Sequence, residues 1–211
     1  MKIGIIGSGN VGGTLGKRWA RNGHAVVFSS RHPQSREMQE LVQAAGFNAK
    51  AGSTTDAVEQ SDILLLATPW NATEQALKSA GDLAGKLLID ATNPILPDLS
   101  GLALEPNTSA GEKVAQWAAG AKVVKAFNTV GNNIMENPAF SNARPVLLYC
   151  GDDKGAKQTV TSLISELGLE PLDAGPITQA RVLESFALLW ISLAFKAGYG
   201  REIAFQFLRR N

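Results

Sequence analysis

The sequence predicts an α/β fold in which helices cover both faces of a doubly wound parallel sheet. Along most of the 211 residues, short aliphatic and β-branched runs alternate with segments of helical periodicity, as in folds built from β-α-β units. The run at 63–67 is apolar throughout, which is typical of a strand buried on both faces of a parallel sheet. A glycine-rich turn at 7–12 follows the first expected strand, which indicates a Rossmann-type arrangement.

The order of the elements follows from these patterns and from the residues that interrupt them. Gly23, Gly46 and Gly168 end helices, and Ser53 or Thr54 begins one. We expect strands at 2–6, 25–28, 47–51, 63–67, 87–91, 122–127 and 145–150. We expect helices at 11–22, 35–45, 55–60, 73–80, 112–119 and from the Gly151-Asp152-Asp153 cap to 167.

The last third of the chain differs from the rest, which predicts a boundary at residue 144. Residues 1–144 form the expected dinucleotide-binding domain, and 145–211 form a small α/β, mainly helical extension packed on it. In this extension we expect a short extended piece at 169–172, a loop at 173–176, a long apolar helix from 178 or 179 to about 196, and a final helix at 201–209. The extension is expected to complete the acceptor site and to carry dimer contacts.

Composition excludes several classes of protein. The hydrophobic share is 45%, the charged share 18% and the net charge +1, so a nucleic-acid partner is not expected. Cys150 is the single cysteine, and no Cys/His cluster has metal-ligand spacing, so no metal is expected. The first strand begins at residue 2 and the apolar run 186–195 is short, so we expect no signal peptide, no membrane span and a cytoplasmic protein.

The turn Gly7-Ser8-Gly9-Asn10-Val11-Gly12 predicts a dinucleotide pyrophosphate site. Such a motif is weak alone, but here it lies between a strand and a helix, the context that it requires. Gly7 permits the tight turn, Gly9 lets the pyrophosphate approach the backbone, and Gly12 lets the helix pack on the sheet. The helix N-terminus then favours the anion.

The end of the second strand predicts which dinucleotide binds. An NAD site usually has an acidic residue there, which holds the ribose 2′-hydroxyl. Here the chain has Ser29, Ser30, Arg31 and His32. The guanidinium of Arg31 suits a phosphate, so we expect NADP(H), with Arg36 as a weaker contact. The alternative is an ordinary polar loop before Pro33.

Three later loops should meet at the nicotinamide end, because ligands bind beyond the carboxyl ends of parallel strands. The expected cofactor contacts in these loops are Ala67, Thr68, Pro69 and Asn93. The expected acceptor contacts are Trp70, Asn93, Pro94, Phe127, Asn128 and Thr129. Turn chemistry for the prolines and core packing for Trp70 are the alternatives.

No catalytic acid or base is identified near these loops. His24 is expected to be structural, His32 lies beside the phosphate site, and Cys150 resembles a buried apolar residue more than a nucleophile. A transfer between two redox rings needs mainly orientation and exclusion of water. We therefore expect hydride transfer by positioning alone, with Lys125 a poor candidate because it lies within a strand.

The late apolar helix predicts self-association. The helix carries more apolar residues than one packing face needs. They are Phe186, Leu188, Leu189, Trp190, Ile191 and Leu193. Because large exposed apolar patches mark interaction sites, we expect a homodimer; a core helix within one chain is the alternative.

The chain resembles the NADPH-dependent reductases of the deazaflavin coenzyme F420 and the cytosolic reductase domain of the six-transmembrane metalloreductases. The resemblance lies in residues 5–10, 29–31, 68–70, 124–129, 150–153 and 173–176, in the same order along nearly the whole chain. It implies that Ser8, Asn10, Ser30 and Arg31 belong to the NADP site. It also implies that the Trp70, Asn93 and 127–129 loops line the acceptor.

The resemblance does not specify the acceptor. Asn71-Ala72-Thr73 follows Trp70, where the deazaflavin reductases have a more charged continuation, and the Asn93-Pro94 loop is closer to the metalloreductases. The predicted function is hydride transfer between NADP(H) and a small-molecule acceptor, either F420 or a flavin such as FMN or FAD. Reduction of a ferric chelate through flavin, reduction of a small imine or hydroxy acid, and a non-catalytic NADP-binding module are the alternatives.

Overall fold

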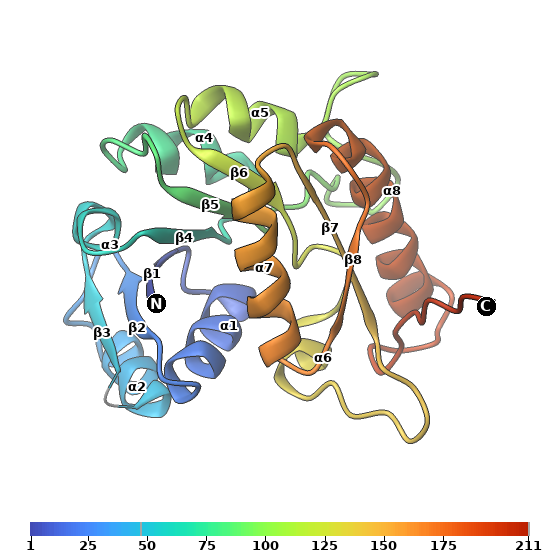
Figure 1. Ribbon diagram of the computed structural model, residues 1–211, viewed down its shortest axis with the longest axis horizontal. Helices are drawn as coiled ribbons and strands as arrows, with labels where there is room; N and C mark the ends of the chain where they lie inside the picture. The colour runs from blue at the N-terminus through green and yellow to red at the C-terminus, as the bar shows by residue number, and fades with distance from the viewer. Residues whose placement is uncertain (47, 211) are drawn as a thin grey trace.

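A single eight-stranded sheet forms the centre of the computed structural model, which describes residues 1–46 and 48–210 (Figure 1). The strands lie in the order β3-β2-β1-β4-β5-β6-β7-β8. Their bounds are β1 (Lys2–Ile6), β2 (Ala25–Ser29), β3 (Ala49–Gly52), β4 (Ile63–Leu66), β5 (Leu87–Asp90), β6 (Lys122–Lys125), β7 (Val146–Gly151) and β8 (Glu170–Asp173). The predicted α/β class is confirmed. The sheet also continues past residue 144, where β7 runs antiparallel to β6 and β8 runs parallel to β7.

Helices cover both faces of this sheet (Figure 1). Their bounds are α1 (Asn10–Arg21), α2 (Arg36–Ala45), α3 (Thr54–Glu59), α4 (Trp70–Lys78), α5 (Ala110–Trp117), α6 (Asn132–Glu136), α7 (Lys154–Glu166) and α8 (Ala180–Ile191). Alternate strand residues supply the two cores. On one face Ile5 and Leu65 pack with α1, α2, α6 and α7, and on the other Leu64 and Leu66 pack with α3, α4 and α5.

Local signals explain where several helices begin. Ser53 and Asp56 form a capping box at α3, with Ser53 N donating to Asp56 Oδ2 over 2.8 Å and Asp56 N donating to Ser53 Oγ over 3.0 Å. Asp153 caps α7 by accepting from Ala156 N over 2.8 Å. A Cβ at Gly4 would lie 2.5 Å from the Ala57 carbonyl oxygen, so glycine permits α3 to pack closely on β1.

The predicted helix at 201–209 is wrong, because this segment is irregular. Its backbone finds partners outside the segment: Val146 N donates to Phe205 O over 2.9 Å, and Trp190 Nε1 donates to Ile203 O over 2.9 Å. The Val146 amide is available because β6 pairs only with the far end of β7, at Cys150 and Gly151. Tertiary hydrogen bonds therefore replace the local ones that a helix would make.

Smaller differences concern element bounds and one short helix. The strand expected at 47–51 is Ala49–Gly52, and Phe47 lies outside the described residues. Helix α4 begins at Trp70, three residues before its expected start. Helix α6 was not predicted. It has only five residues and closely follows the 127–129 loop, which was interpreted as an acceptor contact.

The predicted late apolar helix is confirmed. It is longer than the run 186–195, whose shortness led us to expect no membrane span. Helical structure is continuous from Ile177 to Lys196, with a π-helical turn at Ser192–Lys196. By length and composition this stretch could cross a bilayer, but a third of it is buried within the fold, and core helices pass the same test. The absence of a membrane span therefore stays a prediction.

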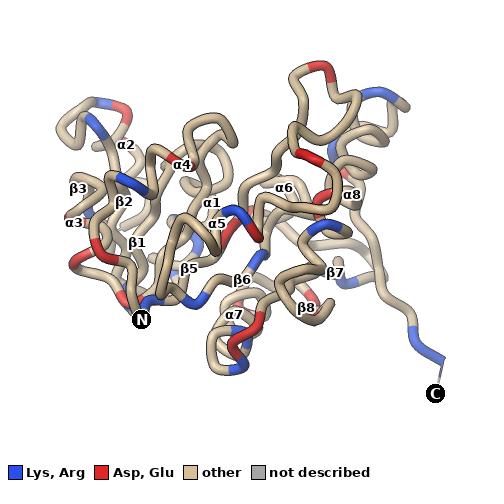
Figure 2. Tube along the Cα trace, turned by 90° about the horizontal axis from the view of Figure 1, so that it is seen from above, with Lys and Arg blue, Asp and Glu red and all other residues tan. Residues whose placement is uncertain are grey.

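Charges of both signs are interspersed along the chain (Figure 2), in keeping with a formal net charge of +1. The expected absence of a nucleic-acid partner stays a prediction.

Candidate cofactor and acceptor site

The carboxyl ends of β1, β2, β4, β5 and β6 lie along one edge of the sheet, because these five strands are parallel. The strand order reverses between β1 and β4. This is the switch point at which doubly wound sheets open a crevice for ligands.

The glycine turn has the geometry expected of a pyrophosphate site. Gly7 has a φ of +99°, and a Cβ there would lie 2.7 Å from the Ala67 carbonyl. A Cβ at Gly12 would overlap the Gly7 carbonyl oxygen, whereas a Cβ at Gly9 would meet nothing within 4 Å. Among the described residues no side chain caps the α1 N-terminus, so its amides can receive an anion.

A cleft of about 550 Å³ brings together predicted cofactor residues from three strand ends. Gly7 and Ser8 follow β1, Thr68 follows β4, and the remaining three are at the end of β2: Ser29, Ser30 and Arg31. Ser8 Oγ donates to Ser29 O over 3.0 Å, so the glycine turn is held against the end of β2.

A second hollow of about 410 Å³ adjoins this cleft. It shares Ser8 and Ser30 with the cleft and adds Gly9, Asn10 and Ser35. Arg31 is exposed at the rim, whereas Arg36 pairs with Glu40 over 2.7 Å. His32 is exposed and is not among the described residues that line either hollow. Its backbone N–H donates to Ser30 Oγ over 3.0 Å.

Sequence reasoning missed one wall of the cleft. It is formed by Thr54 of α3, by Ala72, Gln75 and Ala76 of α4, and by Ser79, the C-cap residue of that helix. These last four positions are spaced i, i+3, i+4 and i+7, which places them on one face of the helix and its C-cap. Small and polar residues at that spacing, directly after the Thr68 loop, were a signal that could have indicated this wall.

The predicted acceptor residues Asn93 and Asn128 contact each other rather than the cofactor cleft. Asn93 Nδ2 donates to Asn128 O over 3.0 Å, and Asn128 Nδ2 donates to Asn93 Oδ1 over 3.2 Å and to Leu183 O over 3.3 Å. Asn128 Oδ1 and Thr129 Oγ1 are buried and have no partner among the described residues. Such atoms are costly to leave unpaired, so a bound hydrogen-bond donor would suit them.

The two predicted aromatic contacts pack against other aromatic rings. Trp70 stacks on Trp117 with a centroid distance of 5.3 Å, which matches the core-packing alternative and covers one face of the indole. Phe127 is 1% exposed and meets Trp19 edge-on at 5.6 Å. Its φ of +63° is unusual for a bulky residue and marks a backbone that the surrounding structure holds in place.

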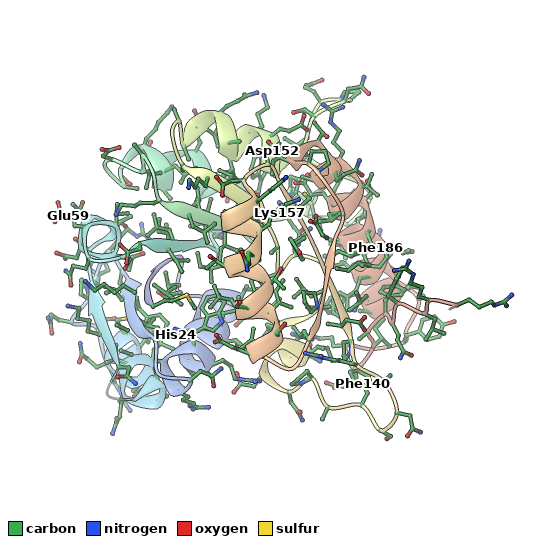
Figure 3. All side chains as sticks on the ribbon, viewed as in Figure 1. His24, Glu59, Phe140, Asp152, Lys157 and Phe186 are labelled. Carbon is green, nitrogen blue, oxygen red and sulfur yellow. The ribbon has the colours of Figure 1, made fainter. Side chains whose placement is uncertain are left out.

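Prolines and the remaining reactive groups have mainly structural surroundings. Pro69 precedes α4, and its carbonyl accepts from Thr73 Oγ1 over 3.1 Å; Pro94 is buried. His24, labelled in Figure 3, lies beside the C-terminal end of α7, with Nε2 2.7 Å from Glu166 Oε2. Burial raises the pKa of the Cys150 thiol to about 12, so this cysteine is not an activated nucleophile.

Comparisons with known proteins show similarity along most of the chain. Residues 2–94 match the family described as NADP oxidoreductase, coenzyme F420-dependent. Metalloreductase STEAP3 of Rattus norvegicus is 30% identical over 190 residues, which are 89% of this chain. The chain spans about 36% of the length of that metalloreductase.

Solved structures extend the similarity over the whole fold. A candidate F420-dependent NADP reductase from Arthrobacter sp. FB24 superposes with a TM-score of 0.88 and 29% identity, over 99% of this chain and 100% of that one. An imine reductase from Aspergillus terreus in complex with NADPH4 has a TM-score of 0.68 at 20% identity, over 93% of this chain and 63% of that one, and shows the fold alone. These findings confirm the resemblance: residues 2–94 match the family described as coenzyme F420-dependent NADP oxidoreductases, and the chain is similar over nearly its whole length to reductases.

Proposed function

We propose that this protein transfers a hydride between NADP(H) and a redox-active ring, either the deazaflavin F420 or a flavin. The observation that carries the proposal is the cleft in which Arg31 and Ser30 lie beside the glycine turn. Serine hydroxyls and a guanidinium replace the acidic residue of an NAD site at the end of β2. This donor set suits a 2′-phosphate.

The residues of the chain would bind and orient the two rings. When bound, NADP(H) supplies or accepts the hydride at its nicotinamide. The α1 amides would hold the pyrophosphate, with Ser8 keeping the turn in place through Ser29. The unpartnered Asn128 Oδ1 and Thr129 Oγ1 would accept from an N–H group of the acceptor ring. Hydride transfer between two rings needs no side-chain acid or base, in keeping with the loops as described.

The acceptor is proposed from the family and its relatives rather than from contacts. The matched family is F420-dependent, and the metalloreductase relatives make reduction of a ferric chelate through flavin the second candidate. The imine reductases share the fold at 20% identity. Reduction of a small imine or hydroxy acid and a non-catalytic NADP-binding module are the alternatives that remain if none of the rings is reduced.

The decisive experiment compares NADPH with NADH against F420, FMN, FAD and a ferric chelate, in wild type and in Arg31→Ala. Loss of one charge-assisted contact, worth about 1.5–3 kcal/mol, should lower kcat/KM for NADPH roughly 10- to 100-fold and leave NADH turnover unchanged. Arg36→Ala is the matched control, because Arg36 is exposed and paired with Glu40. Equal use of NADH and NADPH by the wild type would overturn the phosphate assignment, and no turnover of any ring would overturn the acceptor class.

We further propose a cytoplasmic homodimer that associates through the outer face of α8. Val182, Leu189 and Phe195 are 60%, 49% and 57% exposed, which is unusual for large apolar side chains on one helical stretch. An apolar hollow of about 320 Å³ beside them is lined by Leu193, Tyr199 and Ile203 to Phe205. Phe186, on the same side of the molecule (Figure 3), already packs on Phe205 at 4.6 Å between centroids.

A further inference from the structure

A lysine is completely buried beneath the proposed acceptor loops. Lys125 is the last residue of β6 and is 0% exposed. Its Nζ lies 2.9 Å from Asp90 Oδ2 at the end of β5 and 2.9 Å from Glu184 Oε1 on α8. It also donates to Thr92 O over 2.6 Å. One ammonium therefore joins two strands, a loop and a helix.

Both carboxylates have further partners. Asp90 Oδ1 accepts from Thr92 N over 2.9 Å and from Thr92 Oγ1 over 2.7 Å. The Glu184 carboxylate accepts from Ala110 N and Gly111 N, each over 3.0 Å, at the N-terminus of α5. The α5 dipole offsets the second negative charge. Burial alone would lower the pKa of Lys125, but the charges of Asp90 and Glu184 raise it, so the ammonium stays protonated.

The cluster is continuous with the two asparagines of the acceptor side. Thr92, which is bound to both Lys125 and Asp90, immediately precedes Asn93. Leu183, next to Glu184 on α8, accepts from Asn128 Nδ2 over 3.3 Å. Two contacts therefore hold the Asn93–Asn128 pair. Lys125 fixes the loop after β5 through Thr92, and Leu183 of α8 binds Asn128.

Stability alone does not account for such a cluster. Replacing buried ion pairs by well-packed apolar residues is often neutral or stabilising, because two charges lose their hydration on burial. What the cluster adds is a set of directional bonds that fix α8 and the 92–93 loop relative to β6.

We infer that Lys125 is a positioning residue that sets the geometry of Asn93 and Asn128, and through them the binding of the acceptor but not of NADPH. The inference rests on the proposed function for the identity of the acceptor side. It predicts a division of roles: the glycine turn and Arg31 determine cofactor binding, and the Lys125 cluster determines acceptor binding.

The test uses the full chain with an apolar replacement, Asp90→Leu/Lys125→Met/Glu184→Leu, and with the single variant Glu184→Gln. In both we expect the Kd for NADPH to change less than twofold and the KM for FMN or F420 to rise at least tenfold. The ¹⁵N side-chain amide resonances of Asn93 and Asn128 should shift. Val160→Ala, on the buried face of α7, is the destabilised control and should change neither the KM nor those resonances.

Two outcomes would overturn the inference. One is a folded variant whose Asn93 and Asn128 resonances and acceptor KM equal those of the wild type. The other is a loss of NADPH affinity as large as the loss of acceptor affinity. The resonances report on the loops and do not depend on turnover. Failure of the proposed acceptor chemistry would therefore be seen separately, because the wild type would then reduce none of the rings. If the triple variant does not fold, Glu184→Gln, which keeps the side-chain shape, decides.

Discussion

Gly12 and Gly13 are neighbours in α1, but their surroundings predict opposite effects of alanine. At Gly12 a Cβ would overlap the Gly7 carbonyl oxygen, so Gly12→Ala should lower the free energy of unfolding by about 1–3 kcal/mol and weaken NADPH binding. At Gly13 the nearest atoms to a Cβ are 3.5 Å away, so Gly13→Ala should raise that free energy by up to about 1 kcal/mol through helix propensity. Urea unfolding and NADPH titration of both variants check this, and equal stabilities would contradict it.

The cleft residues at the strand ends were predictable one by one because their placement depends on local chain geometry. A glycine turn after a strand, and hydroxyls with an arginine after the next strand, lie close together in any parallel sheet. Lys125 was set aside because its position within a strand says nothing about Asp90 or Glu184. Lys125 is at the centre of a hydrogen-bond network only because the fold brings together residues that are far apart in the sequence.

Among the elements, α5 and α8 are joined by an ion pair that predicts acid sensitivity. Arg181 donates to both oxygens of Glu112, over 2.8 Å and 2.6 Å, and these bonds hold the pKa of that carboxyl below its usual value although burial opposes them. A lowered folded-state pKa contributes stability that is present above the unfolded value and lost as the pH falls through the folded one.

The expected result is a fall in Tm below about pH 4.5, the usual range of a glutamate, that is smaller in Glu112→Gln than in the wild type. Thermal melts from about pH 6 to pH 3 measure it. The control is Glu59→Gln, an exposed position at the end of α3 (Figure 3), which should follow the wild type. A Glu112→Gln curve parallel to that of the wild type would show that the pair does not act in this way.

Strand and helix periodicity predicted the sheet because each of its elements has an apolar face that local spacing reveals. The same reasoning failed at 201–209. There the Phe205 carbonyl accepts a hydrogen bond from β7 and the Ile203 carbonyl accepts one from Trp190. No local sequence pattern encodes those partners.

For the whole molecule, the proposed dimer makes a direct prediction. Leu189→Glu places a charge on the exposed face of α8, where Leu189 is 49% exposed, so it should not disturb the fold but should oppose burial of that face. Sedimentation should give twice the chain mass for the wild type and the single chain mass for the variant. Ala84→Glu, an exposed position before β5, should stay dimeric. A monomeric wild type would refute the dimer.

The buried ammonium also has a consequence for the order in which the protein is completed during synthesis. Asp90 and Lys125 leave the ribosome well before Glu184, which lies 59 residues after Lys125. Until α8 arrives, the lysine and the first amides of α5 lack the carboxylate that they later share. The nucleotide cleft can therefore take shape while the chain is still growing, whereas the acceptor side is finished only after α8 has been made.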